Sequence, residues 1–341
     1  VRRRRTRAHI CVCLRRRRGV DSARAAGRAR RRYHRLRRAA RGGAAHPQGR
    51  RWQVRALSGE GGVDAAPSRE VVPEEVVEAT LPLAWLDRCG RVDATFEHTF
   101  GDGSRASGMT LLMVAMASGR KKLAEEILRR GADVSLQNSN GSYALGLAAA
   151  NGYAQPAEQQ RRDRADACRR KLVELVLRHG AEVDQRNKVG STALMQAAYN
   201  RREQIVDTLI RHGAAIDMQD SVGGTALMAV AYKGHERIVD MLVRHSAEID
   251  LQAKDGGTAL MLAANNGHER VVELLLQRGA EINLQSSKGV TALMNAAIPG
   301  HERVVEVLMQ HGAEVDLQDS YGFTALMVAA IQGHAAVVLR L

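Results

Sequence analysis

Residues 258–289 read TALMLAANNGHERVVELLLQRGAEINLQSSKG, and this stretch decides the fold. Related stretches follow one another at intervals of 33 residues, with one interval of 49 residues. The intervals are measured from the first residue of each copy, namely Thr110, Tyr143, Thr192, Thr225, Thr258, Thr291 and Thr324. Similarity at a fixed period of this length indicates a repeat protein, in which each unit packs on its neighbours.

Each unit predicts two short helices followed by an extended, turn-rich excursion. The hydroxyl of Thr258 suits the N-cap of a first helix, because it can accept from exposed N–H groups of the first turn. Gly267 favours the end of that helix, and Glu269 places an acid at the positive end of the second helix. Two helices this short cannot bury their apolar faces alone, so stacking must stabilise the unit.

The unit is similar to the ankyrin repeat. That family's consensus has Thr-Pro-Leu-His, a Gly-His before the second helix and Gly-Ala-Asp-Val-Asn after it. In this chain Ala259 stands for the Pro and Met261 for the His, and the same exchange recurs in most units. The resemblance covers residues 109–341. It implies an all-α, helix-turn-helix solenoid of seven units with short hairpin loops, in which partners touch the hairpin tips and the exposed side of the first helices.

Three segments depart from the regular array. Residues 1–70 predict a disordered basic tail, and residues 71–108 predict a degenerate repeat that ends in a long Gly- and Ser-rich loop over 95–108. The second unit carries a 16-residue insertion, residues 153–168. Pro156 suits a first helical turn, so we expect a polar, projecting helix from about Ala157 to His179. Because Leu341 falls inside the second helix of the seventh unit, we expect the chain to be a fragment of a longer array.

The charge is divided unequally along the chain. Residues 1–55 hold 21 Arg, no Lys and the single acid Asp21, so this segment carries +20. The whole chain carries +14, which leaves −6 for residues 56–341. Nucleic-acid association is therefore expected only through residues 1–55. For this tail a nuclear-targeting signal, a transit-type presequence, a nucleic-acid-binding segment and an error in the gene model all stay open.

No motif predicts catalysis, a cofactor or a metal. His-Glu pairs occur at His235, His268 and His301, but none has a second His four residues later, as a metalloprotease helix requires. The four cysteines, Cys11, Cys13, Cys89 and Cys168, form no disulfide framework. No apolar run is long enough for a membrane-spanning helix. The chain is therefore expected to be no enzyme, and a reducing compartment, the cytoplasm or the nucleus, is favoured.

By position in the unit, candidate partner-binding residues lie on the first helices and at the hairpin tips. On the first helices they are Tyr199, Tyr232, Asn265 and Asn266. At the tips they are Asp220, Lys254, Asp255, Lys288, Asp319 and Tyr321. Tyr is a favoured interface anchor. The competing interpretation is that these are simply the positions that the core leaves unconstrained.

Two single residues carry further expectations. Ankyrin repeats resemble known substrates of an asparaginyl hydroxylase, and at the equivalent hairpin position only Asn283 is an Asn in this chain. Ser246 stands where five other units place a Gly after the second helix, so strain is expected if its backbone is left-handed.

The sequence thus predicts a monomeric interaction scaffold or adaptor that binds an unidentified protein. One alternative is the recognition arm of a larger enzyme, such as a kinase or a ubiquitin ligase, with its catalytic domain elsewhere. The other is nucleic-acid association through the Arg-rich tail.

Overall fold

The computed structural model describes residues 92–99, 105–150 and 159–341, all within the unit Trp52–Leu341. The tail predicted over residues 1–70, most of the degenerate repeat predicted over 71–108 and the first part of the insertion lie outside the described residues.

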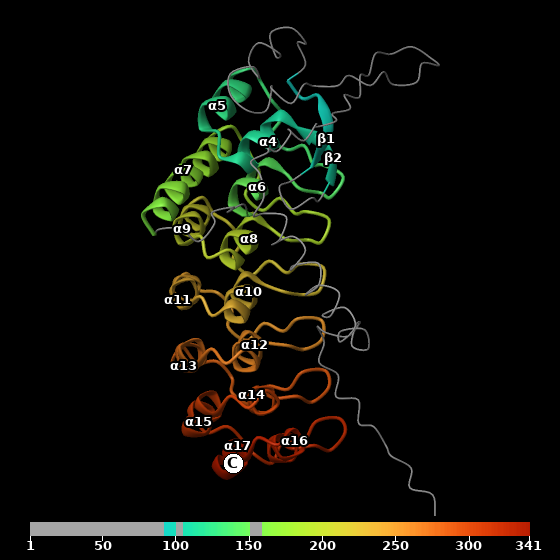
Figure 1. Ribbon diagram of the computed structural model, residues 1–341, viewed down its shortest axis with the longest axis vertical. Helices are drawn as coiled ribbons and strands as arrows, with labels where there is room; N and C mark the ends of the chain where they lie inside the picture. Colours follow the sequence, from blue (N-terminus) through green and yellow to red (C-terminus); the bar gives the residue numbers. More distant parts are fainter. Residues whose placement is uncertain (1–91, 100–104, 151–158) are drawn as a thin grey trace, which may run out of the picture. The chain divides into compact units, whose positions relative to one another are not determined.

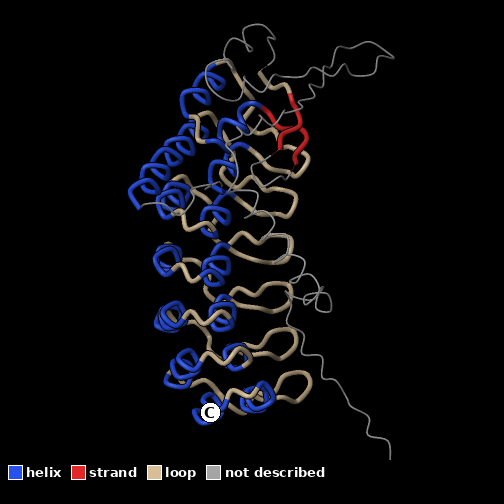
Figure 2. The backbone as a smooth tube through the Cα atoms, viewed as in Figure 1, coloured by secondary structure: helices blue, strands red, loops and turns tan. Residues whose placement is uncertain are grey.

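The described residues form a solenoid of helix pairs in two layers (Figure 1). The pairs are α4 (Leu111–Ser118) with α5 (Lys121–Arg129), α6 (Ala144–Ala150) with α7 (Gln159–Arg178), α8 (Ala193–Tyr199) with α9 (Glu203–Arg211), α10 (Ala226–Lys233) with α11 (Glu236–Arg244), α12 (Ala259–Asn265) with α13 (Glu269–Gln277), α14 (Ala292–Ala297) with α15 (Glu302–Gln310), and α16 (Ala325–Gln332) with α17 (Ala335–Arg340). First helices stack on first helices, and the hairpin loops project on the side away from the second helices (Figure 2). The expected helical repeat fold is confirmed.

The threonine that opens each regular unit caps the first helix, as predicted. Its hydroxyl accepts from the backbone N–H of the Met three residues later, at 3.2–3.4 Å in all six units that have the Thr. The bond satisfies one of the amides that a helix N-terminus leaves without an intrahelical acceptor. Burial of the Thr side chains, as at Thr225, makes this partner necessary.

The core is a thin layer of small aliphatic side chains. Ala263, Ala264 and Leu260 of α12 are buried, and Val271, Val272 and Leu275 of α13 meet them from the second layer. Small side chains let neighbouring first helices approach closely, which explains how a chain with 3% aromatic residues closes its core. The Met column is buried from Met195 to Met294, whereas Met327 on the last first helix is 47% exposed.

A short β-ribbon occupies the segment that was expected to be a long loop. Strands β1 (Thr95–Thr99) and β2 (Arg105–Thr110) pair antiparallel, with a bulge between Phe96 and His98. Thr and Phe favour strands, a signal that the Gly and Ser residues of this segment obscured. Strand β2 leads directly into α4, so the ribbon extends the first hairpin of the array.

The insertion lengthens a second helix, as predicted. Helix α7 spans 20 residues, whereas the second helices α9, α11, α13 and α15 span nine. It packs against α5, α6 and α9. The helix is continuous through Cys168, the position where other units break the chain with Gly, and Cys168 Sγ donates to the Gly119 carbonyl at 3.6 Å. The expected start at Ala157 lies just outside the described residues.

Successive hairpins touch through their backbones. The Lys254 N–H donates to the Val222 carbonyl at 3.0 Å, and the same bond joins the other hairpins of units two to six. A Cβ on Gly256, whose φ is +77°, would lie 2.4 Å from the Ser287 nitrogen of the next hairpin. Only glycine fits this approach, because a side chain would be strained by the positive φ and would also collide with backbone.

A second ladder of side chains runs beside these tips. Gln219 Nε2 donates to the Gln252 carbonyl at 2.9 Å, and Gln252 and Gln285 repeat the contact with the following hairpin. Gln137 donates to the Arg186 carbonyl at 2.8 Å, and the Arg186 guanidinium continues the ladder to Gln219. Each of these side chains therefore links its hairpin to the next one.

Tyr143 replaces the capping Thr of the second unit and is fully buried. Burial raises the pKa of its phenol above the ordinary value. Gly146 occupies the place of the core Met in this unit, and a Cβ there would lie 3.0 Å from Tyr143 Cζ. The Tyr ring thus fills the space that Met fills elsewhere, and the two exchanges compensate one another.

The compensation predicts strong coupling between the two positions. Gly146→Met should lower the free energy of unfolding by about 1–3 kcal/mol, because it overpacks the site beside the ring. In the background of Tyr143→Thr, the same change should raise it. A double-mutant cycle from urea unfolding measures the coupling, and additive effects would contradict the compensation.

Ser246 has a left-handed backbone, with φ of 66°, so the condition for the expected strain is met. At the equivalent Gly213 and Gly279 a Cβ would meet nothing within 4 Å, so the strain at Ser246 comes from the backbone alone.

Ser246→Gly should therefore stabilise the array by about 0.5–1 kcal/mol, since relief of strain exceeds the added freedom of Gly in the unfolded chain. Urea midpoints of the two proteins measure the change. The control is Gly279→Ser, which should lower the midpoint by a similar amount; an unchanged midpoint for Ser246→Gly would show that the left-handed backbone carries no strain.

Candidate protein interface

The predicted tip residues divide into turn-forming and outward-pointing side chains. Asp220 Oδ1 accepts from the amides of Val222 and Gly224, at 2.9 and 2.8 Å. Asp319 Oδ1 holds the last hairpin in the same way, through Tyr321 and Phe323. The carboxylates of Asp220 and Asp319 therefore have a structural role that their tip position did not reveal.

A second tip position comes two residues after these turn-forming residues. This tip column consists of Asn140, Val189, Val222, Asp255, Lys288 and Tyr321. Val189 and Val222 are 57% and 64% exposed, and sequence reasoning missed both. The 33-residue spacing from Asp255 and Lys288 was the signal that could have found them. Two neighbouring hairpins thus present an aliphatic side chain to solvent, and Tyr321 ends the column as an exposed aromatic residue.

On the first helices the structure brings Tyr199 and Tyr232 together. Lys233 Nζ lies 4.3 Å from the centroid of the Tyr199 ring and 5.6 Å from that of Tyr232. The two Tyr residues are 45% and 38% exposed, and Lys233, which the sequence reasoning did not select, is exposed as well. The contact is a cation–π interaction that positions all three side chains at the ends of α8 and α10.

The predicted Asn265 and Asn266 are less available than the two Tyr. Both are half-buried at the end of α12. Asn266 Nδ2 donates to the Leu262 carbonyl at 2.8 Å, and the Asn265 carbonyl accepts from His301. Their polar groups therefore contribute to the helix end and to the contact with the next unit.

A histidine of the next unit contacts a backbone carbonyl at the end of the preceding first helix. His235 Nε2 lies 3.2 Å from the Tyr199 carbonyl, and His268 Nε2 lies 3.0 Å from the Tyr232 carbonyl. His301 and His334 make the same contact. These residues precede the second helix, as predicted, and their side chains tie one unit to the previous one.

In the third unit Arg202 takes the place of this histidine. It pairs with Asp166 of α7. Arg201 beside it has φ of 58°, at a position where the units with a regular turn have Gly.

Burial lowers the pKa of His235, and the charges of Arg201, Lys233 and His268 lower it further, although the bond to the Tyr199 carbonyl opposes them. The folded protein therefore favours the neutral imidazole. A depressed folded-state pKa contributes stability above the unfolded value of 6.5, and this contribution is lost as pH falls below that value.

We expect the urea midpoint of the wild type to fall more than that of His235→Gln between about pH 7 and about pH 5. Gln keeps a donor for the Tyr199 carbonyl but does not titrate, so the difference between the two slopes isolates His235. Parallel slopes would contradict the prediction.

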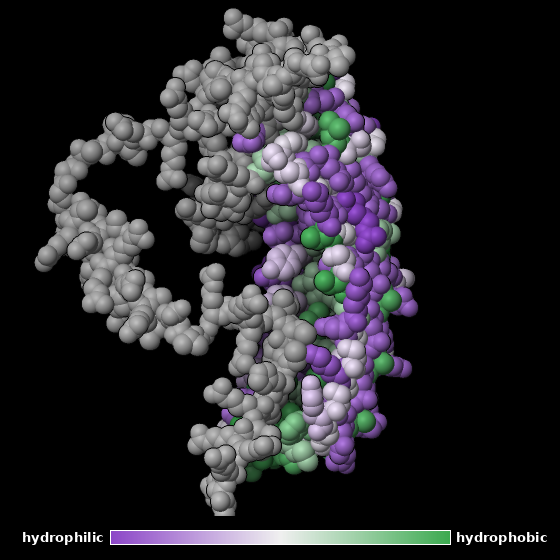
Figure 3. Space-filling model, turned by 90° about the vertical axis from the view of Figure 1, so that its right-hand side faces the viewer, coloured by the Kyte–Doolittle hydropathy of each residue, from purple (hydrophilic) through white to green (hydrophobic). Residues whose placement is uncertain are grey.

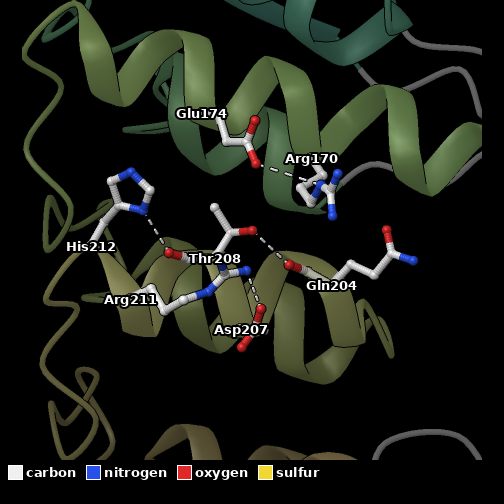
Figure 4. A network of polar contacts seen from close by, with 7 residues as sticks. All are labelled: Arg170, Glu174, Gln204, Asp207, Thr208, Arg211 and His212. Carbon is white, nitrogen blue, oxygen red and sulfur yellow. Dashed lines mark hydrogen bonds and ion pairs between the residues drawn. The ribbon is translucent and has the colours of Figure 1, made fainter.

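The second-helix layer pairs its own polar groups. Between α7 and α9, Arg170 lies near Glu174, Arg211 pairs with Asp207, and the Thr208 hydroxyl donates to the Gln204 carbonyl at 2.8 Å (Figure 4). His212 Nδ1 lies 2.8 Å from the Thr208 carbonyl in the same group. Each of the charged side chains named here has a partner on its own helix.

The coloured part of the hairpin side that Figure 3 shows is mostly hydrophilic, with separate hydrophobic side chains among the polar ones. Dispersed apolar anchors within a polar surface suit a reversible protein interface.

Both polar atoms of the Asn283 side-chain amide form hydrogen bonds with Glu314. Its Oδ1 accepts from the Glu314 N–H at 3.0 Å, and its Nδ2 donates to Glu314 Oε1 at 2.9 Å. Asp184, Asp217 and Asp250 hold the following hairpin through the same backbone contact. Hydroxylation of Asn283 stays a prediction.

These features define a helical repeat protein with no catalytic constellation among the described residues. The model of ankyrin repeats in three copies matches residues 165–255, 205–286 and 260–341, and the single ankyrin repeat model matches residues 107–139. The chain belongs to the ankyrin repeat family. No curated protein matched it. Within the described part of the chain, no helix has the length and apolar character to span a bilayer.

Proposed function

We propose that this protein is an interaction scaffold or adaptor, which binds a partner protein through the exposed ends of its first helices and its hairpin tips. Ankyrin repeats are in general non-catalytic modules for protein–protein interaction. In this proposal Tyr199 and Tyr232 are the anchor residues of the interface. Further contacts come from the hairpin-tip residues Lys254, Asp255, Lys288 and Tyr321. The chain acts as a monomer in the cytoplasm or the nucleus.

One observation carries the proposal: the large apolar side chains exposed in the middle of the array gather in three consecutive units, the second to the fourth. These are Val189 and Val222 on the tips and Tyr199 and Tyr232 on the helices. Exposed apolar side chains cost solubility, and Tyr is prominent among interface anchors, so the cluster supports a binding role.

A comparison of two surface variants tests the proposal. The first variant changes the proposed interface and is called the face variant. It combines Tyr232→Ala with Val222→Asp, both at exposed positions. The control is Arg270→Glu on the second-helix layer, where the Arg side chain is 80% exposed. Each full-length protein is used as bait with covalent proximity labelling in cells, after urea midpoints show that all are folded.

We expect a set of proteins labelled by the wild type and the control and lost with the face variant, since the face supplies the contact. If the face variant labels the same proteins as the wild type, the proposed surface is wrong.

A further inference from the structure

Two exposed cations follow the two Tyr residues in the chain, Arg201 two residues after Tyr199 and Lys233 directly after Tyr232. Lys233 contacts both rings, and Arg201 follows Tyr199 in the turn after α8. In the described part of the chain no carboxylate forms an ion pair with Lys233 or Arg201. Both act on the same neighbour, because their charges lower the pKa of His235.

The acids that directly follow Arg201 and Lys233 in the chain are already paired. Glu203 lies 3.6 Å from Arg237, and Glu236 lies 3.7 Å from Arg270. Asp166 of α7 pairs with Arg202, the neighbour of Arg201. The array therefore leaves a local excess of positive charge at the turn, although residues 56–341 as a whole carry −6.

The backbone at Arg201 is a second, independent observation. Its φ of 58° is left-handed, and Gly119, Gly234, Gly267, Gly300 and Gly333 take the equivalent place in other units. A non-glycine residue in this conformation is strained, so Arg at this place reduces stability and brings a cation beside the Tyr pair. Strain that persists in this way is common where a side chain serves binding.

From these observations we infer that the turns after α8 and α10 bind an acidic peptide segment of the partner protein. Its carboxylates contact Arg201 and Lys233, and its chain lies against the rings of Tyr199 and Tyr232. This inference rests on the proposed function and adds the chemistry of the partner.

Charge and size favour a short acidic peptide over a nucleic acid. Residues 109–341, which hold the repeats, carry no net charge, so the positive charge of the two cations is local and matches a few carboxylates rather than an extended polyanion. The two Tyr rings offer apolar area and a hydroxyl each, which suits contacts with a peptide.

Carbodiimide coupling tests the site in the full-length chain. The reagent joins a carboxylate to a lysine amine that holds it, and residues 1–120 contain no Lys, so the side chains of the Arg-rich tail cannot couple. The lysines are Lys121, Lys122, Lys171, Lys188, Lys233, Lys254 and Lys288. The probe is an N-acetylated hexaglutamate amide, and mass spectrometry gives the yield at each lysine, divided by its acetylation rate without the probe.

We expect Lys233 to couple several-fold more than Lys188 and Lys254, which lie at the hairpins. Arg201→Gly should lower the coupling at Lys233 several-fold while raising the urea midpoint, so loss of folding cannot explain the loss of binding. Tyr199→Ala should lower the coupling as well. Arg270→Glu, on the second-helix layer, should leave it unchanged.

Equal coupling at Lys233, Lys188 and Lys254, or full coupling at Lys233 in Arg201→Gly, would overturn the inference. If that happens while the face variant still loses its partners in cells, the proposed function stands and only the acidic chemistry of the partner is wrong.

Discussion

The close backbone contact between successive hairpins is the constraint on which the rest of the array depends. In units three to six a tip amide donates to a carbonyl of the previous hairpin, as Lys254 does to Val222, and the Gln ladder repeats the link beside it. This contact sets the spacing between units, and it requires Gly at positions such as Gly256, where a Cβ would meet backbone at 2.4 Å. A fixed spacing then brings the small residues of neighbouring first helices into contact.

The irregular features of the array concentrate in units two to four. In the second unit the large Tyr143 and the small Gly146 compensate for one another, and α7 stays helical where other units have a turn. Arg201 in the third unit and Ser246 in the fourth have left-handed backbones. The exposed Tyr pair and the aliphatic tips occupy the same stretch of the chain. Regular units thus supply stability, and the region that departs from the repeat carries the candidate interface and the residues that reduce stability.

The repeat period made most of this fold predictable from sequence. The Thr cap, the helix pairs and the lengthened α7 all followed from residue types at fixed positions. The candidate site was less predictable, because exposure depends on which hairpin residue points outward. Asp220 and Asp319 were selected at the tips, yet they hold the turns, and Val222 two residues beyond Asp220 is the exposed side chain. The link of Lys233 to two Tyr rings joins two units, so no single unit reveals it.

Hydrogen exchange of individual backbone amides tests the central claim, that hairpin contacts hold the units in register. The amides to follow are those of Ser221, Lys254 and Ser287, which donate to the previous hairpin, and that of Asp255, for which the described residues provide no acceptor. Although all four lie at exposed loop tips, the account predicts that the first three exchange at least about tenfold more slowly than Asp255, after correction for intrinsic rates. Equal rates for all four amides would contradict it and would place the source of register in the helices alone.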